Sequence, residues 1–132
     1  MRRIDRLLLL GFFAVPSLPA QAADLNGAWT IDTASCARVF TKQNNKVAFR
    51  QDADFEAGGL IVQGKKITGT FQKCTVKSFR DDGSNKKVIA SCSDGVSFSD
   101  VAFDLKIVGQ NAITLSQTQP VPVQVSYVRC SL

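Results

Sequence analysis

The chain has 132 residues, a formal net charge of +5, four cysteines and no histidine. This length supports one domain, and 45% hydrophobic with 20% charged residues is too apolar for a disordered chain. The lack of histidine excludes Ser-His-Asp and Cys-His catalysis, and every zinc site that needs an imidazole.

The N-terminal segment has the features of a secretory signal peptide. An arginine-rich start precedes nine apolar residues from 7 to 15, and Ala20-Gln21-Ala22 has the small-x-small pattern that signal peptidase accepts. A helix of nine residues cannot cross a hydrocarbon core of ~30 Å. We therefore predict a cleaved signal over 1–22, a single domain over 23–132, no stable membrane span, and a periplasmic or secreted location.

The four cysteines, Cys36, Cys74, Cys92 and Cys130, all lie in the predicted mature domain. An even number in a small exported domain indicates two disulfides, for which three pairings exist. Their spacings of 38, 18 and 38 lack the close pairs of a four-thiolate metal site. The sequence thus predicts disulfides, with no metal and no cofactor.

Short alternating runs separated by turn residues indicate an all-β domain. Strands are expected around Trp29, at 47–49 and at 60–62, followed by one long run from 67 to 80. Between the first two strands, Ala34–Lys42 has the spacing of a short helix that ends at Asn44-Asn45.

The polar segment Asp81–Asn85 predicts a turn that returns the long run as a hairpin. With Gly83 at its centre, Cys74 lies opposite Cys92. Directly opposite residues have Cβ atoms about 4.5 Å apart, close to disulfide range. The register therefore predicts the pair Cys74–Cys92 and, by elimination, Cys36–Cys130.

The same register pairs Ser78 with Val88 and Lys86 with Arg80. Apolar positions at the start of the run are odd-numbered, whereas Cys74 and later apolar positions are even-numbered. A β-bulge near Gln72-Lys73 would bring both sets to one face.

The last third predicts three further strands. Residues 101–107 alternate in polarity, and a turn at 109–111 pairs Ile107 with Ile113 and Leu105 with Leu115. Residues 121–127 also alternate, with prolines where a strand begins. Seven or eight antiparallel strands with one short helix predict a small up-and-down β-barrel. A two-sheet β-sandwich is the alternative.

The apolar faces of these strands supply the residues expected inside the barrel. Their side chains either fill a core or line a ligand cavity, and both interpretations stay open. The set comprises Trp29, Phe71, Val101, Phe103, Leu105, Val123, Val125 and Tyr127. The aromatic bulk, which also includes Phe49, Phe79 and Phe98, favours a filled core.

Six lysines lie on or beside the predicted hairpin at 67–93, namely Lys65, Lys66, Lys73, Lys77, Lys86 and Lys87. Because like charges directly opposite are unfavourable, an anionic partner would explain the facing pair Lys86 and Arg80. A lysine-rich, aggregation-resistant hairpin is the favoured explanation of the cluster, since Asp81 and Asp82 neutralise part of it. Without residues 1–22 the chain is only mildly basic, so no nucleic-acid partner is expected.

Three acids alternate in the segment 52–56, which invites comparison with a calcium-binding loop. Ala57 occupies the position of the required glycine, and Gln63 that of the final acid, so a solvated loop is expected instead. With no nucleophile motif and no paired carboxylates, the sequence predicts a protein that is not an enzyme.

The segment Gly27-Ala28-Trp29 resembles the Gly-x-Trp start of the first strand in lipocalin-type barrels. The resemblance implies that Trp29 packs at the closed end beneath an arginine of the last strand, a position that Arg129 matches. The chain is also similar to a small periplasmic protease-inhibitor family with eight strands and the same motif, and to short exported proteins of Gram-negative bacteria.

We therefore expect an exported, non-enzymatic β-barrel that binds a small apolar ligand or an envelope or secreted protein partner. The alternative is a periplasmic or secreted inhibitor of a protease or of a cell-wall hydrolase. An inhibitor would insert an exposed element, either residues 23–25 or the tip at Asp81–Asn85.

Overall fold

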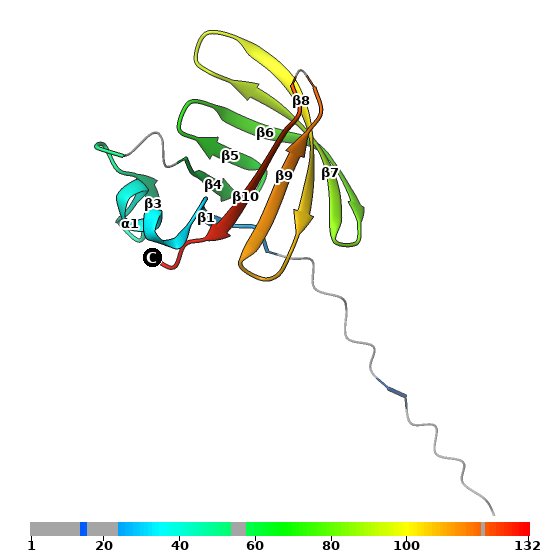
Figure 1. Ribbon diagram of the computed structural model, residues 1–132, viewed down its shortest axis with the longest axis horizontal. Coiled ribbons are helices and arrows are strands. Elements are labelled where there is room, and N and C mark those ends of the chain that lie inside the picture. Colours follow the sequence, from blue (N-terminus) through cyan, green and yellow to red (C-terminus); the bar gives the residue numbers. More distant parts are fainter. Residues whose placement is uncertain (1–13, 16–23, 54–57, 120) are drawn as a thin grey trace, which may run out of the picture.

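The computed structural model describes residues 14–15, 24–53, 58–119 and 121–132. Eight antiparallel strands close into a barrel in the order β1-β10-β9-β8-β7-β6-β5-β4, as Figure 1 shows. The strands are β1 (Gly27–Thr30), β4 (Leu60–Gln63), β5 (Lys66–Gly69), β6 (Lys73–Asp82), β7 (Asn85–Ser93), β8 (Phe98–Ile107), β9 (Ala112–Gln117) and β10 (Val123–Arg129). The predicted barrel is confirmed, and the chain does not form the alternative sandwich.

The predicted signal segment, apart from residues 14–15, lies outside the described residues, so its cleavage stays a prediction. Within the described ranges, no helix has the length and apolar character needed to cross a membrane.

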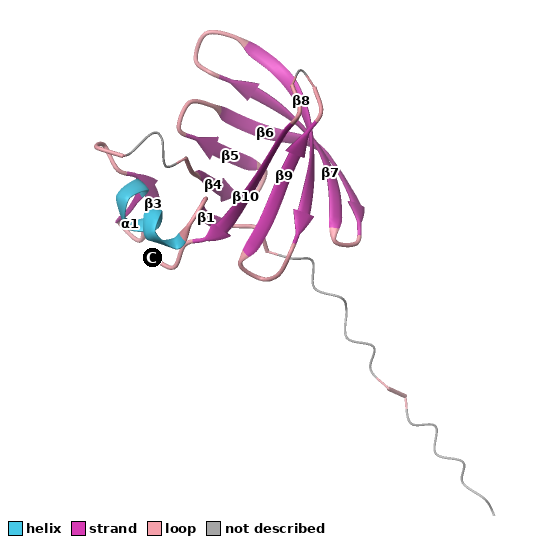
Figure 2. Ribbon diagram, in the orientation of Figure 1, coloured by secondary structure: helices cyan, strands magenta, loops and turns pink. Residues whose placement is uncertain are grey.

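A small unit between β1 and β4 lies beside the barrel (Figure 2). It consists of a 3₁₀ turn at Thr33–Ser35, α1 (Cys36–Val39) and a hairpin of β2 (Phe40–Gln43) and β3 (Lys46–Phe49). The helix predicted over Ala34–Lys42 is therefore wrong in its second half. Asn44 and Asn45 have φ angles of 52° and 62°, the left-handed conformation that a two-residue hairpin turn requires. The asparagine pair turns a hairpin and does not end a helix.

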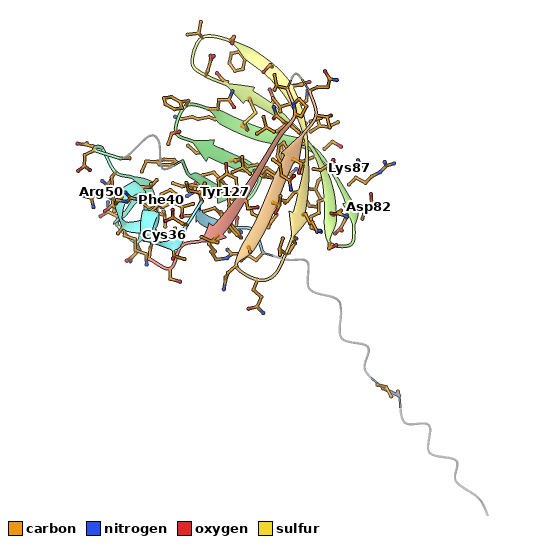
Figure 3. The ribbon with its side chains drawn as sticks, viewed as in Figure 1. Cys36, Phe40, Arg50, Asp82, Lys87 and Tyr127 are labelled. Carbon is orange, nitrogen blue, oxygen red and sulfur yellow. A yellow bond between two sulfur atoms is a disulfide. The ribbon has the colours of Figure 1, made fainter. Side chains whose placement is uncertain are left out.

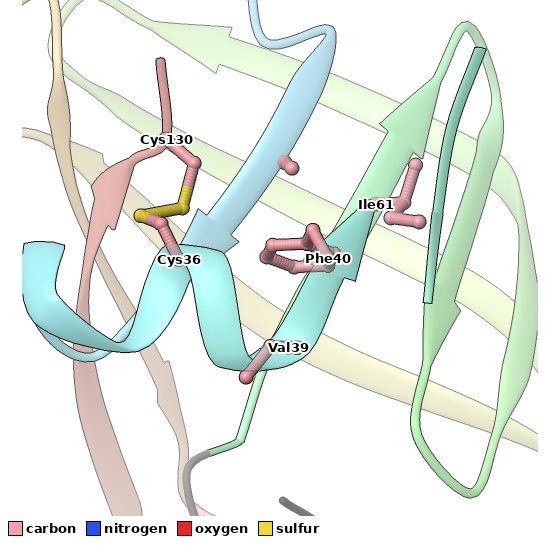
Figure 4. Close-up of a cluster of buried hydrophobic side chains, with 6 residues drawn as sticks. Cys36, Val39, Phe40, Ile61 and Cys130 are labelled. Atoms are coloured by element: carbon pink, nitrogen blue, oxygen red, sulfur yellow. A yellow bond between two sulfur atoms is a disulfide. The ribbon is translucent and has the colours of Figure 1, made fainter. Parts of the chain in front are cut away.

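This unit covers the outer face of β1 and β4. Val39 and Phe40 are buried against Ala28 and Ile61, and the Cys36–Cys130 disulfide borders the same cluster (Figure 4). The cluster holds the unit on the barrel wall, because its apolar side chains have no other buried surface to contact.

Both predicted disulfides are present, Cys36–Cys130 and Cys74–Cys92. Cys74 lies directly opposite Cys92 in the β6–β7 pair, as the predicted register requires. In the β8–β9 pair, Ile107 faces Ile113 and Leu105 faces Leu115, which confirms that register as well.

The bulge in β6 lies between Val76 and Ser78, not near Gln72-Lys73 as predicted. Beyond it, Ser78 pairs with Ile89 and Phe79 with Val88, so the predicted pairing of Ser78 with Val88 is wrong. Without the shift, Ser78 would occupy the inward position that Phe79 takes.

The predicted run from 67 to 80 is two strands, because the chain turns between Gly69 and Gln72. The Gly69 backbone N–H donates a 2.7 Å hydrogen bond to the Gln72 carbonyl oxygen. This turn makes β5 and β6 a hairpin, with Thr68 opposite Lys73.

Removing the two disulfides should destabilise the protein unequally. Cys36–Cys130 spans 94 residues and Cys74–Cys92 spans 18, so chain entropy predicts losses of about 4.7 and about 3.2 kcal/mol. Urea unfolding of the variants C36A/C130A and C74A/C92A tests this ranking. Equal midpoints in the two variants would contradict the loop-entropy explanation.

Candidate functional site

The barrel encloses a cavity of about 1080 Å³. Its wall is built from alternate, inward-facing positions of the strands, as the period of two in a β-strand requires. Of the residues predicted to lie inside, the wall contains Phe71, Val101, Phe103, Leu105, Val123, Val125 and Tyr127. Sequence reasoning missed Ile113 and Leu115, although the register that paired them with inward residues of β8 already carried that information.

The barrel is hollow because many inward-facing side chains are small. The inward positions of β7 hold Val88, Ala90 and Cys92. Cys92 forms a disulfide with Cys74, which lies directly opposite it on the neighbouring strand β6. The predicted aromatic core is correct for Trp29, which is buried, and for Phe103 and Tyr127, which pack against its cluster. It is wrong for Phe71, Phe79 and Phe98, which are exposed.

Trp29 lies inside the barrel where β1 pairs with the last residues of β10. Its side chain is fully buried in the cluster with Leu60, Val88, Leu105 and Ile113. Its indole N–H donates a 3.0 Å hydrogen bond to the Leu25 carbonyl oxygen. Trp29 therefore forms the floor of the site and is not part of the cavity wall.

The Arg129 side chain lies over the ring of Trp29. Its guanidinium carbon lies 4.3 Å from the centre of the Trp29 ring, a cation–π contact. The guanidinium also donates hydrogen bonds to the carbonyl oxygens of Asp24, Asn26 and Gln110. These contacts tie the chain before β1 and the β8–β9 turn to the last strand.

Gly27 of the Gly-x-Trp segment is required by the same arrangement. Its φ of +131° favours glycine, and a Cβ there would lie 3.2 Å from the Arg129 guanidinium. Any other residue would strain the backbone and displace Arg129.

The six predicted anionic-partner lysines divide into two groups. Lys86 is buried and paired with Asp81 at 2.8 Å, which corrects the predicted facing of Lys86 and Arg80; Arg80 instead faces Lys87. Lys77 and Lys87 form ion pairs with Asp100 and Asp104, and Figure 3 labels Lys87 beside the β6–β7 hairpin. Lys65, Lys66 and Lys73 are the members whose amines are in none of the ion pairs of the described residues.

Lys86 is the first inward-facing residue of β7, next to the β6–β7 turn. Its ammonium lies 5.5 Å from the centre of the Phe79 ring and donates a hydrogen bond to the Gly83 carbonyl oxygen. The hydrogen bond from Lys86 holds the pKa of Asp81 below its usual value. A buried cation with these contacts is part of the fold, and an anionic partner cannot reach it.

The polar groups on the cavity wall are mostly neutral. Tyr127 and Ser116 line the cavity, and Gln72 and Gln117 line it next to the β5–β6 and β9–β10 turns. The Asp94 carboxylate accepts hydrogen bonds from the backbone N–H groups of Ser97 and Val96 in its own turn, which lowers its pKa. The site therefore offers a mainly apolar wall with a few neutral hydroxyl and amide groups, and with the exposed charged residues Asp24, Lys65 and Asp94 in its lining.

No group of three or more cysteine, aspartate or glutamate side chains is placed to hold a metal ion in the described ranges. Residues 54–57 of the segment compared with a calcium loop lie outside those ranges.

A scan against protein-family models and searches of curated proteins and of solved structures gave no match. The functional conclusion therefore depends on the geometry of the cavity.

Loss of the guanidinium from Arg129 should destabilise the closed end. The variant Arg129→Met removes the donors to three backbone carbonyls, at about 3 kcal/mol for charge-assisted hydrogen bonds in a partly exposed site. Urea unfolding followed by the fluorescence of the single tryptophan measures it. The control Arg80→Met, at an exposed position of β6, should change stability by less than about 0.5 kcal/mol. Equal losses would mean that Arg129 is merely a surface residue.

The single tyrosine provides a direct probe of the cavity. Burial raises the pKa of Tyr127 above its usual value of 10.0, so native protein should ionise at higher pH than protein unfolded in urea. The neutral phenol thus stabilises the fold fully below about pH 10, and this contribution disappears as pH rises through the folded pKa. Absorbance titration of phenolate formation checks it. Coincident native and unfolded curves would show a solvated hydroxyl.

Proposed function

We propose that this protein is an exported, non-enzymatic carrier that binds one small apolar molecule inside its barrel. The observation that carries the proposal is the cavity of about 1080 Å³ with a mainly apolar wall. Ligand pockets span roughly 300–1,000 Å³ and combine apolar walls with a few polar groups. The volume supports a ligand the size of a lipid or a similar amphiphile.

The electrostatics of the wall favour a neutral ligand. The wall offers Tyr127, Ser116 and Gln117 as hydrogen-bonding partners, whereas its charged residues, Asp24, Lys65 and Asp94, are exposed to solvent and not buried in the wall. Transferring an unpaired charge from water into such a site costs far more than transferring a hydroxyl or an amide. We therefore expect an uncharged head group on the ligand.

Two disulfides support a location outside the reducing cytosol, since such bonds persist in oxidising compartments. The predicted signal over residues 1–22 agrees with export to the periplasm or beyond. A carrier there would keep a water-insoluble molecule dispersed between envelope sites.

The alternative of an inhibitor has less support in the geometry. The carbonyl groups of Asp24 and Leu25 are bound by Arg129 and Trp29, so this part of the proposed inserting segment is fixed to the barrel; residue 23 lies outside the described ranges. The Asp81–Asn85 tip is a tight turn braced by Lys86. The described residues of both segments are held by contacts with the barrel, which favours the carrier over an inhibitor that inserts a loop.

A cavity-filling variant tests the carrier proposal directly. Val125 lines the cavity, whereas its neighbour Gln124 is exposed. Val125→Trp should weaken binding of the neutral fluorescent probe N-phenyl-1-naphthylamine at least about tenfold, because the indole fills the space the probe needs. Gln124→Trp adds the same bulk outside the barrel and should bind like the unaltered protein. Fluorescence titration measures both.

Competition against the same probe defines the head group. A long-chain alcohol should displace the probe better than the carboxylate of equal chain length. The reduced, unfolded protein has no cavity and should bind no probe. Binding that survives Val125→Trp unchanged would place the probe elsewhere and remove the support for a carrier.

A further inference from the structure

The open end of the barrel has a rim of exposed apolar side chains. Val96 is 93% exposed, Phe98 82%, Phe71 71% and Val121 61%. They belong to three turns, β5–β6, β7–β8 and β9–β10, or to the first residue after a turn. All three turns lie at the upper end of the barrel in Figure 1. We call these four residues, with Val123, the apolar rim.

The opposite end of the barrel has a different composition. Its turns, at 63–66, 81–85 and 108–111, consist of polar residues and glycine apart from Val108, which is 61% exposed, and Trp29 and Arg129 lie together at this end. Exposed apolar groups that gather at one end of a soluble domain mark an interaction surface, whereas single scattered ones do not.

We propose that the apolar rim inserts into the surface of a lipid bilayer. The rim is continuous with the cavity, since Phe71 and Val123 belong to both. Covering the rim with acyl chains would connect the cavity to hydrocarbon without an intervening layer of water. A bilayer fits better than a protein partner, because fluid chains adapt to three separate turns around an opening, whereas a protein needs a continuous complementary face.

One lysine beside the rim can contact lipid head groups. Lys73 is exposed and begins β6 two residues after Phe71. Its amine is in no ion pair of the described residues, whereas the Asp94 carboxylate in the β7–β8 turn stays negative because backbone N–H groups of that turn lower its pKa. Apolar insertion therefore supplies most of the attachment. Each lysine near an anionic surface strengthens attachment in a salt-dependent way. The inference of ligand exchange rests on the proposed carrier function, but bilayer attachment itself does not.

Flotation of the full disulfide-bonded protein with vesicles of phosphatidylethanolamine and phosphatidylglycerol tests the proposal. Val96 and Phe98 belong to the rim but not to the cavity wall, so Val96→Ser/Phe98→Ser should weaken vesicle binding about tenfold and leave probe binding unchanged. The control Ile89→Ser/Val108→Ser removes two exposed apolar groups elsewhere and should float like the unaltered protein. High salt should change binding of the unaltered protein only slightly, because apolar insertion is not screened.

Three results would overturn the proposal. The unaltered protein fails to float, or the two double variants lose binding equally, or the rim variant abolishes concentration-dependent self-association in light scattering while flotation persists. The last result would assign the rim to a second copy of the chain. Because probe titration in solution reports on the cavity and flotation on the rim, failure of one is distinguishable from failure of the other.

Discussion

The barrel wall closes through a short seam, and the cavity depends on it. β1 meets β10 through only two residue pairs, Trp29 with Arg129 and Thr30 with Val128. Inside the seam Arg129 stacks on Trp29; outside it, the Cys36–Cys130 disulfide joins α1 to the residue that follows β10. If the seam opened, β1 and β10 would become free edges and the cavity would lose one side. A noncovalent clamp and a covalent bond on opposite faces compensate for the few backbone hydrogen bonds.

The hollow interior has an energetic consequence. Protein interiors are normally packed like organic crystals, and the lining of an open space loses dispersion contacts. Here the β7 side chains on the wall, Val88 and Cys92, are too small to cross the barrel. An apolar ligand would restore those contacts, so ligand binding and folding stability would be coupled through the same side chains. The Cys74–Cys92 bond keeps the wall intact when the space is empty.

Much of the barrel was predictable, because strand alternation and turn residues are local signals. The pairing of Cys74 with Cys92 followed from one turn, and the closing contact of Arg129 with Trp29 followed from a short motif. The Asn44-Asn45 turn was misinterpreted, because asparagine both ends helices and adopts the left-handed conformation of a hairpin. The bulge after Val76 was misplaced, because only the inward position of Phe79 on the cavity wall and the pairing of later residues reveal it.

Whether the barrel is filled or hollow could not be read from the sequence. Phe71 and Phe98 have the hydrophobicity of core residues, yet they lie on a turn and at a strand start, where the side chain reaches solvent. Burial depends on how far each strand extends beyond its neighbours. β6, β7 and β8 have 10, 9 and 10 residues, against 4 each for β4 and β5. The aromatic residues that would have filled a regular barrel therefore lie at its rim.

The two ends of the barrel set a direction for any amphiphilic ligand. The deep wall contains Val88, Leu105 and Ile113, all buried, whereas Gln72 and Gln117 lie on the wall near the open end. An apolar tail gains most from the deep wall, and a neutral head group finds hydrogen-bonding partners at the mouth. A lipid held tail-first has its head at the rim, where the bilayer surface of the proposed docking would lie. It then leaves the cavity with its head group in the head-group layer, so transfer would not require the molecule to turn over.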